Sequence, residues 1–268
     1  MKKEMKAILM ILVISMVSIA VALSGCTEEK KTTKIIIGTD ATFPPFEYTD
    51  ENSNIIGFDI DMSKAILTNL GYEVEIKDMG FDQLIGAVQT GIIDVIAAAM
   101  TITNERSQQI SFSNPYYSSD QSVLVRSDSN IKIENYTDFV NLRLGAQTGT
   151  TGALWVEQCL MNISWLQEQN INYSLNITFE SYDSYTSAVM DLTLPTGGRI
   201  NAIVIDKPVG NTFAKKGDTK VIYTIITNES FCLGVKKENT ELLQKINQEL
   251  ASYMASDAWD DLLNKYFG

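Results

Sequence analysis

Arg106 is the residue whose type and position point most directly to chemistry. It ends the stretch Ala99-Met-Thr-Ile-Thr-Asn-Glu-Arg106, which follows an apolar run expected to form a buried strand. A guanidinium group matches a carboxylate with two parallel hydrogen bonds, and Thr101 in the same stretch could add another donor. The stretch therefore predicts a carboxylate site, although Arg106 could instead form a surface ion pair with Glu105.

A second set of donors lies in the segment Gln147-Thr-Gly-Thr-Thr-Gly152, which is expected to open a helix. Hydroxyl groups and free backbone amides at Thr150 and Thr151 would make this helix start suitable for an anion. Asp206 ends another apolar run and could pair with an ammonium group, or it could only cap the following helix. A carboxylate and an ammonium group held in this way describe an α-amino acid.

Aromatic residues would surround the side chain of such a ligand. Phe43 lies in Asp40-Ala-Thr-Phe-Pro-Pro-Phe-Glu-Tyr48, where two prolines stiffen the loop and reduce the entropy lost on binding. Phe81 lies in a further loop, residues 79–84. We expect Phe43 and Phe81 to face the ligand and Phe46 to lie mostly in the core.

The elements that must position these residues follow from the apolar pattern. It predicts strands near residues 34–40, 73–77, 94–98, 121–126, 142–147, 176–180, 200–205, 221–226 and 231–235. It predicts helices near residues 57–71, 81–89, 151–161, 182–192, 208–215 and 241–267, with a polar, irregular excursion over 162–176. Strands that alternate with helices indicate α/β structure with mostly parallel strands.

The alternation of strands and helices occurs twice. We therefore expect a two-lobed α/β fold, with two mixed sheets joined by two crossing strands, rather than one doubly wound domain. The first lobe would comprise residues 34–122 and 227–268, and the second lobe residues 123–226. Ligands bind where strand ends face a crevice, so the cleft between the lobes is the expected site.

The order and spacing of these motifs resemble the extracellular solute-binding proteins of ABC polar-amino-acid importers. The resemblance covers nearly all of residues 34–268 and depends on Gly38-Thr-Asp-x-x-x-x-Pro-Phe-Glu47, Gly57-Phe-Asp-Ile-Asp61, Thr101-x-Thr-x-x-Arg106, Gly149-Thr-Thr151 and Asp206. It implies a periplasmic-binding-protein-like fold that binds a polar L-amino acid and delivers it to an ABC permease. Neither catalysis nor a cofactor is implied, and we expect a monomer.

The same resemblance assigns roles to single residues. Arg106, Thr101 and Thr151 would bind the α-carboxylate, and Asp206 would bind the ammonium group. Phe43 and Phe81 would form aromatic walls. Asp40 and Gln147 would approach the ligand side chain, and Ala99 would contribute mainly its backbone carbonyl.

Composition limits the available chemistry. The chain of 268 residues contains no histidine, which excludes Ser-His-Asp and Cys-His catalysis and removes the commonest metal ligand, so no metal site is expected. The net charge of −12 offers no basic surface for nucleic acid. Cys159 and Cys232 could form a disulfide, but we expect two buried free thiols because the two residues are assigned to different lobes.

The N-terminal segment predicts secretion. Lys2, Lys3 and Lys6 precede an uncharged run that ends in Leu23-Ser-Gly-Cys26. This ending resembles the lipobox of prokaryotic lipoproteins, which implies a signal peptide over residues 1–25 and a lipid on Cys26. Residues 26–33 would then tether the protein to the outer face of the cytoplasmic membrane. An uncleaved membrane anchor is the alternative, because a run of about 17 residues is near the shortest that can span a bilayer.

Two other functions stay open. Some relatives of this fold resemble extracellular dehydratases, and Glu47 is the acid in the expected cleft that could be given a catalytic role. The other alternative is a ligand-sensing domain that reports to a separate receptor.

Overall fold

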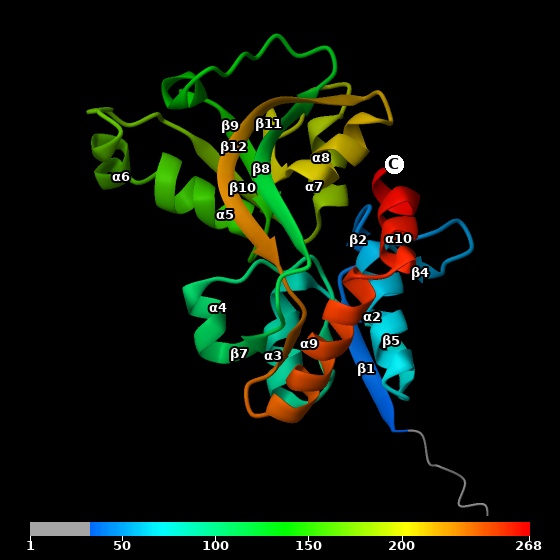
Figure 1. Cartoon of the computed structure of the whole chain (residues 1–268). Helices are drawn as coiled ribbons and strands as arrows, with labels where there is room; N and C mark the ends of the chain where they lie inside the picture. The colour runs from blue at the N-terminus through cyan, green and yellow to red at the C-terminus, as the bar shows by residue number, and fades with distance from the viewer. Residues whose placement is uncertain (1–32) are drawn as a thin grey trace, which may run out of the picture. The chain divides into compact units, whose positions relative to one another are not determined.

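The protein contains two five-stranded mixed sheets (Figure 1). The structure is a computed structural model that describes residues 33–268. The first sheet has the order β5 (Glu73–Asp78), β1 (Lys34–Thr39), β6 (Val95–Ile96), β13 (Gly234–Lys236) and β7 (Ile110–Phe112). Strands β5, β1 and β6 are parallel, whereas β13 is antiparallel to β6 and β7. The predicted leader and Cys26 lie outside the described residues.

The second sheet repeats this design. Its order is β10 (Thr178–Tyr182), β9 (Arg143–Gln147), β11 (Ala202–Asp206), β8 (Tyr117–Arg126) and β12 (Thr219–Phe231). Strands β10, β9 and β11 are parallel, and β8 and β12 continue the sheet in antiparallel pairs. A small third sheet joins β2 (Thr42–Phe43), β3 (Glu47–Thr49) and β4 (Ile55–Ile56).

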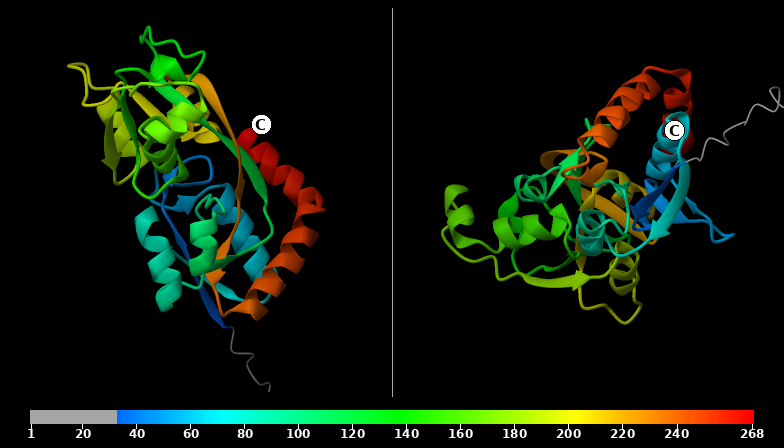
Figure 2. Two further views of the ribbon diagram at one scale, coloured as in Figure 1. Left: turned by 90° about the vertical axis from the view of Figure 1, so that its left-hand side faces the viewer. Right: turned by 90° about the horizontal axis from the view of Figure 1, so that it is seen from below.

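Helices cover both large sheets. In the first half, α2 (Phe58–Asn69) and α3 (Leu84–Thr90) pack on the strands, and α9 (Thr240–Met254) and α10 (Asp257–Phe267) follow one another beside α2 (Figure 2). In the second half, α5 (Thr151–Trp155), α7 (Tyr185–Leu192) and α8 (Lys207–Ala214) contact the sheet. The short helix α4 (Asn104–Gln109) leads into β7.

The predicted α/β architecture, with two mixed sheets and two crossing strands, is confirmed. The crossing strands β8 and β12 lie side by side, paired from Tyr117 with Phe231 to Arg126 with Thr219. Phe231 also bridges to Thr101, so the end of β12 reaches the first half of the molecule. The predicted lobe limits, 122/123 and 226/227, fall inside β8 and β12.

Several predicted elements differ in detail. The strands predicted near 221–226 and 231–235 are one long strand, β12, followed by the short strand β13. The predicted helix over 241–267 is two helices, and the helix that begins at Thr151 continues as a π-helical turn over Val156–Leu160. The small sheet of β2, β3 and β4 was not predicted.

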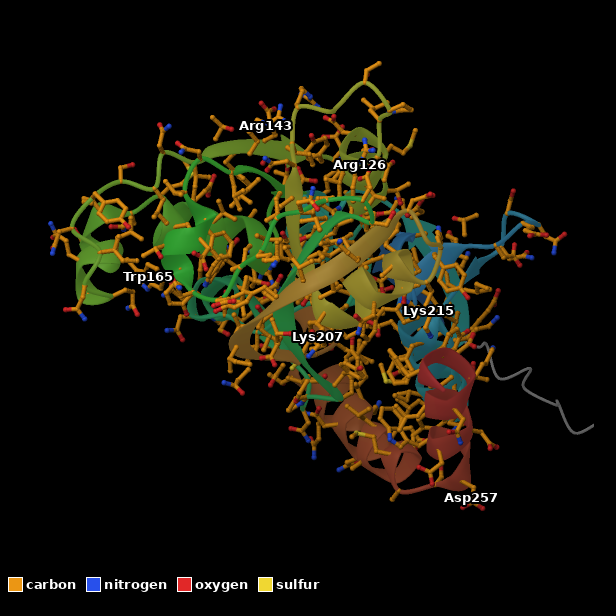
Figure 3. All side chains as sticks on the ribbon, turned by 90° about the horizontal axis from the view of Figure 1, so that it is seen from above. Arg126, Arg143, Trp165, Lys207, Lys215 and Asp257 are labelled. Atoms are coloured by element: carbon orange, nitrogen blue, oxygen red, sulfur yellow. The ribbon has the colours of Figure 1, made fainter. Side chains whose placement is uncertain are left out.

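The expectation of an irregular excursion over residues 162–176 is wrong for its first half. Helix α6 (Ile163–Glu168) lies there, and Figure 3 shows Trp165 of this helix at the edge of the molecule. The Asn162 side chain caps α6 by accepting hydrogen bonds from the backbone N–H groups of Ser164 at 2.9 Å and Trp165 at 3.3 Å. The polar composition of this segment gave no helical pattern, and the capping residue Asn162 was the sequence feature that could have indicated a helix.

The core is continuous across the two halves. One cluster of buried side chains includes Ile37 and Phe46 from the first half and Ala146 and Ile203 from the second. Within residues 33–268, no helix combines the length and apolar character needed to cross a membrane.

Both cysteines in the described part of the chain are free thiols, as predicted. Cys232 is buried, but Cys159 is only half-buried, which corrects the expectation for that residue. Burial raises the pKa of each thiol to about 11, so both stay protonated and unreactive near neutral pH.

Candidate functional site

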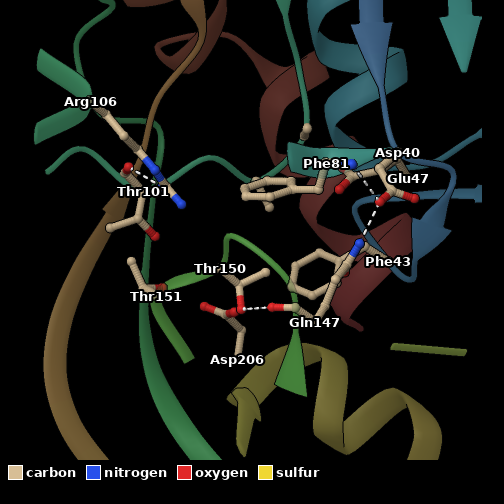
Figure 4. Close-up of a pocket in the computed structure, with 12 residues that line it drawn as sticks. Asp40, Phe43, Glu47, Phe81, Thr101, Arg106, Gln147, Thr150, Thr151 and Asp206 are labelled. Atoms are coloured by element: carbon tan, nitrogen blue, oxygen red, sulfur yellow. Dashed lines mark hydrogen bonds between the residues drawn. The ribbon is translucent and has the colours of Figure 1, made fainter. Parts of the chain in front are cut away.

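One cavity collects every residue that the sequence predicted to contact a ligand (Figure 4). The structure brings together Asp40, Phe43, Phe81, Ala99, Thr101, Arg106, Gln147, Thr150, Thr151 and Asp206, and adds Glu47 and Ala98. The space not filled by atoms between these side chains is about 320 Å³, part of which is open to solvent. The cavity lies at the carboxyl ends of β1, β6, β9 and β11, so both sheets contribute to it.

Arg106 is held in the cavity from both halves. Its Nη1 donates to the Thr101 carbonyl at 2.6 Å and its Nη2 donates to the Gly149 carbonyl at 2.9 Å. The guanidinium carbon lies 5.3 Å from the centre of the Phe81 ring, a distance suited to a cation–π contact. The residue is only 6% exposed, so a surface ion pair with Glu105 does not explain it. Burial lowers the pKa of Arg106, yet an arginine stays charged in proteins.

Asp206 presents its carboxyl group on the other side of the cavity (Figure 4). It is the residue before α8, but its side chain makes no capping hydrogen bond, so the capping alternative is wrong. Its Oδ1 is buried and has no hydrogen-bond partner among the described residues. Burial, and then repulsion from Glu229, raise the pKa of Asp206 well above its ordinary value. An orphaned acceptor of this kind is costly unless a cation meets it.

The threonine hydroxyls are already engaged within the protein. Thr150 Oγ1 donates to the Gln147 carbonyl at 2.7 Å and accepts from the Ala153 N–H at 3.3 Å, which caps α5. Thr101 Oγ1 and Thr151 Oγ1 donate to other acceptors, described below. A hydroxyl carries one proton, so these hydroxyl groups cannot donate to a ligand while they keep these partners.

Asp40 and Gln147 connect the two halves. Gln147 Nε2 donates to Asp40 Oδ2 at 2.6 Å, and the same oxygen accepts from the Phe81 N–H at 3.1 Å. Asp40 Oδ1 accepts from Thr42 Oγ1 at 2.8 Å. Burial raises the pKa of Asp40, and these hydrogen bonds partly oppose that effect. Asp40 therefore stabilises its own loop through Thr42 and links the two halves through Gln147.

The aromatic residues lie as the sequence predicted. Phe43 and Phe81 line the cavity, whereas Phe46 is fully buried in the core. The Phe43 ring also lies 5.5 Å from the Tyr185 ring of α7, centre to centre, so it touches both halves. Ala99 lines the cavity with a left-handed backbone, at φ 44°.

Glu47 is a further cavity residue, expected from the sequence either to anchor its loop or to serve as the acid of a dehydratase. It lies on β3, is 1% exposed, and its buried Oε2 has no hydrogen-bond partner among the described residues. Burial raises the pKa of Glu47 well above its ordinary value, and repulsion from Asp59, Asp40 and Asp206 adds to the effect. The position of Glu47 directly after the aromatic Phe46 was the sequence feature that could have indicated that it lies in the site.

Glu229, on β12, was missed entirely. Its Oε2 accepts from Thr101 Oγ1 at 2.7 Å and from Thr151 Oγ1 at 2.6 Å. Its Oε1 accepts from Gln121 Nε2 at 3.0 Å. No local motif marks this residue, because its partners come from distant parts of the chain.

The charged groups that line the cavity are mostly acidic. Asp40, Glu47 and Asp206 contribute carboxyl groups, and Arg106 is the cation that lines the same space. Among residues 33–268 there is no grouping of three or more side chains suited to hold a metal ion.

Comparison with known proteins finds relatives that are extracellular solute-binding proteins. The profile of the family described as "Bacterial extracellular solute-binding proteins, family 3" matches residues 35–268. The ABC transporter arginine-binding protein 1 of Escherichia coli K12 is 30% identical over 240 residues, covering 87% of this chain and 90% of that protein. A solved structure of an ancestral arginine-binding protein bound to arginine is 34% identical, with a TM-score of 0.77, covering 88% of this chain and 98% of the other.

A further solved structure bears on the enzyme alternative. The ancestral amino acid-binding protein AncCDT-1, described as a precursor of cyclohexadienyl dehydratase, is 30% identical with a TM-score of 0.76. It covers 88% of this chain and 96% of its own. The same fold thus extends from binding proteins to a precursor of an enzyme.

Proposed function

The chain belongs to the family 3 bacterial extracellular solute-binding proteins, and on that premise we propose that it captures a cationic L-amino acid, with L-arginine as the first candidate. It delivers the amino acid to an ABC permease. Arg106 binds the α-carboxylate, Asp206 binds the α-ammonium group, and Phe43 and Phe81 enclose the side chain.

The buried Glu47 Oε2 atom, which has no hydrogen-bond partner among the described residues, is the observation that favours a ligand with a cationic side chain. The two charged groups of any α-amino acid are matched by Arg106 and Asp206. Asp40 already accepts three hydrogen bonds, from Thr42, Phe81 and Gln147. Glu47 Oε2 accepts none from the described residues, although it is buried. A guanidinium group would supply the missing donors and offset the cost of a buried charge, which reaches several kcal/mol.

Two relatives support this choice, because the Escherichia coli protein and the ancestral protein are both named for arginine. Arginine also carries a flat guanidinium group that aromatic rings can cover. Binding closes two lobes, residues 34–122 with 227–268 and residues 123–226, through β8 and β12. Closure of this kind is a population shift driven by contacts of both lobes with one ligand.

Isothermal titration calorimetry with L-arginine, L-citrulline and L-glutamine tests the proposal. Citrulline has nearly the shape of arginine but a neutral ureido group, so the pair isolates the side-chain charge. We expect arginine to bind at least about tenfold more tightly than citrulline, a difference of about 1.4 kcal/mol. Equal affinity for the two ligands would reject a cationic side-chain site while leaving amino-acid binding intact.

The anchoring belongs to the same proposal. Residues 1–25 are a signal peptide, Cys26 carries a lipid, and the protein works as a monomer on the outer face of the cytoplasmic membrane. Support comes from the Leu23-Ser-Gly-Cys26 sequence. Mass spectrometry of the protein extracted from membranes should show a chain that begins at Cys26 and carries the added mass of a lipid. A chain that retains residues 1–25 would favour an uncleaved anchor.

A dehydratase has one observation in its favour. Burial raises the pKa of Glu47, and a carboxyl group with a raised pKa is a candidate general acid. Cation binding accounts for the same group without catalysis, and we expect no turnover when the protein is incubated with arogenate or prephenate. Measurable product formation that is lost in Glu47→Gln would establish the enzyme instead.

A further inference from the structure

Glu229 occupies an irregular position in the crossing strand β12. Ile225 pairs with Gln121 of β8, and Glu229 pairs with Ser119. Between these two pairs β12 advances by four residues while β8 advances by two, so β12 has a bulge there. The Asp120 carboxylate fixes this bulge by accepting from the N–H groups of Thr227 and Asn228, each at 3.0 Å. Bulges change the direction in which a side chain points. Here the bulge directs Glu229 inward, where it is 9% exposed.

The Glu229 carboxylate joins two segments that belong to different sheets. Its Oε2 accepts from Thr101, which follows β6 of the first sheet, and from Thr151, which begins α5 beside the second sheet. These hydrogen bonds measure 2.7 and 2.6 Å, and Gln121 adds a third donor at 3.0 Å. Hydrogen bonds to a charged acceptor are stronger than neutral ones.

The same carboxylate also balances charge. Attraction from Glu229 opposes the burial that lowers the pKa of Arg106, ahead of any other acid. Arg106 in turn reaches across to the Gly149 carbonyl at 2.9 Å. In this structure the buried Arg106 guanidinium group therefore has a counter-charge within the protein, the Glu229 carboxylate.

We propose that Glu229 is a latch that holds the two halves of the molecule together, acting through the hydroxyl groups of Thr101 and Thr151. It is a positioning residue, and the amino acid meets the backbone of the threonine segments and not their hydroxyls. The latch keeps part of the ligand-free protein closed, and this raises the apparent affinity because less of the protein must change conformation on binding. The inference rests on the proposed function, since it assumes closure around an amino acid.

The closed fraction can be measured in the full chain without ligand by single-molecule fluorescence energy transfer. Dyes can be attached through unnatural amino acids at Lys64 on α2 and Met190 on α7, which are both exposed. We expect a closed population in the wild type that falls at least about threefold in Glu229→Ala, Glu229→Gln and Thr151→Val. Glu238→Gln, at an exposed glutamate, should match the wild type.

A double-mutant cycle separates the latch from a general structural role. L-arginine affinity should fall about tenfold in Glu229→Gln and in Thr151→Val, and the double variant should be no weaker than either alone by more than about threefold. Losses that multiply, a closed fraction unchanged by these substitutions, or a wild type with no closed fraction would each overturn the proposal. If Glu229→Ala fails to fold, the two variants of similar shape carry the test.

The ligand-free measurement keeps this proposal distinct from the proposed function. A wild type that binds no amino acid would refute the proposed function, yet its closed fraction and that of the variants would still decide whether Glu229 acts as a latch.

Discussion

The substitution Glu47→Gln separates recognition of a cationic side chain from recognition of the amino-acid backbone. Glutamine keeps the size of glutamate and removes its charge. Glu47 is 1% exposed and its Oε2 has no partner among the described residues, so a guanidinium group that reaches it gains a charge-assisted hydrogen bond away from water. Such a bond contributes about 1.5–3 kcal/mol, so arginine affinity should fall roughly 10- to 150-fold.

The control is the neutral ligand. Citrulline should bind Glu47→Gln as well as it binds the wild type, or more tightly, because glutamine has no charge to desolvate. Calorimetric titration of both ligands into both proteins at one pH gives the comparison. Unchanged arginine affinity, or an equal loss for the two ligands, would refute the assignment of Glu47 to the side-chain cation.

The pH dependence gives an independent check on the same residue. Burial raises the pKa of Glu47 in the ligand-free protein well above its ordinary value, and a bound cation favours the ionised form. Arginine binding should therefore release protons and should weaken as the pH falls through the raised pKa. Titrations in two buffers that differ in ionisation enthalpy reveal the proton release, which Glu47→Gln should reduce; the part that remains comes from Asp206, whose pKa is also raised by burial.

Three further substitutions test the site and the fold. Arg106→Ala should weaken arginine and citrulline alike by about 3 kcal/mol or more, because it leaves a buried carboxylate without its partner; an unchanged calorimetric affinity would reject the carboxylate role. Burial raises the pKa of Asp59 from 3.8 to about 7, so its contribution to stability is present below about pH 4 and is lost as the pH rises to about 7. The decline in the free energy of unfolding amounts to up to about 4 kcal/mol, and Asp59→Asn should make it smaller. Melting temperatures recorded across this pH range measure the effect. A variant whose melting temperature falls in parallel with that of the wild type would contradict the assignment. Gly57→Ala should lower the free energy of unfolding in urea by about 2–4 kcal/mol, because Gly57 has φ 141° and a Cβ atom there would collide with the Phe46 carbonyl; a wild-type midpoint would show that the loop can adjust.

The sequence alone determined the α/β class and the members of the predicted cavity. Asp40, Ala99, Gln147 and Asp206 each lie at or just beyond the carboxyl end of a strand that the apolar pattern predicted. Parallel strands align these ends at one edge of a sheet, so residues far apart in the chain had to meet there. For Arg106 the sequence left a carboxylate site and a surface ion pair with Glu105 open, and its 6% exposure excludes the surface pair.

Only the tertiary structure decided which polar groups are satisfied and which are free. The Glu229 carboxylate accepts from Thr101, which is 128 residues away, and from Thr151, which is 78 residues away, so no local pattern could reveal the contact. The bulge in β12 directs Glu229 inward, and a bulge depends on how two strands pair. Local periodicity fixes which face of an element a side chain occupies, whereas the partner of a buried carboxyl depends on how distant elements pack around it.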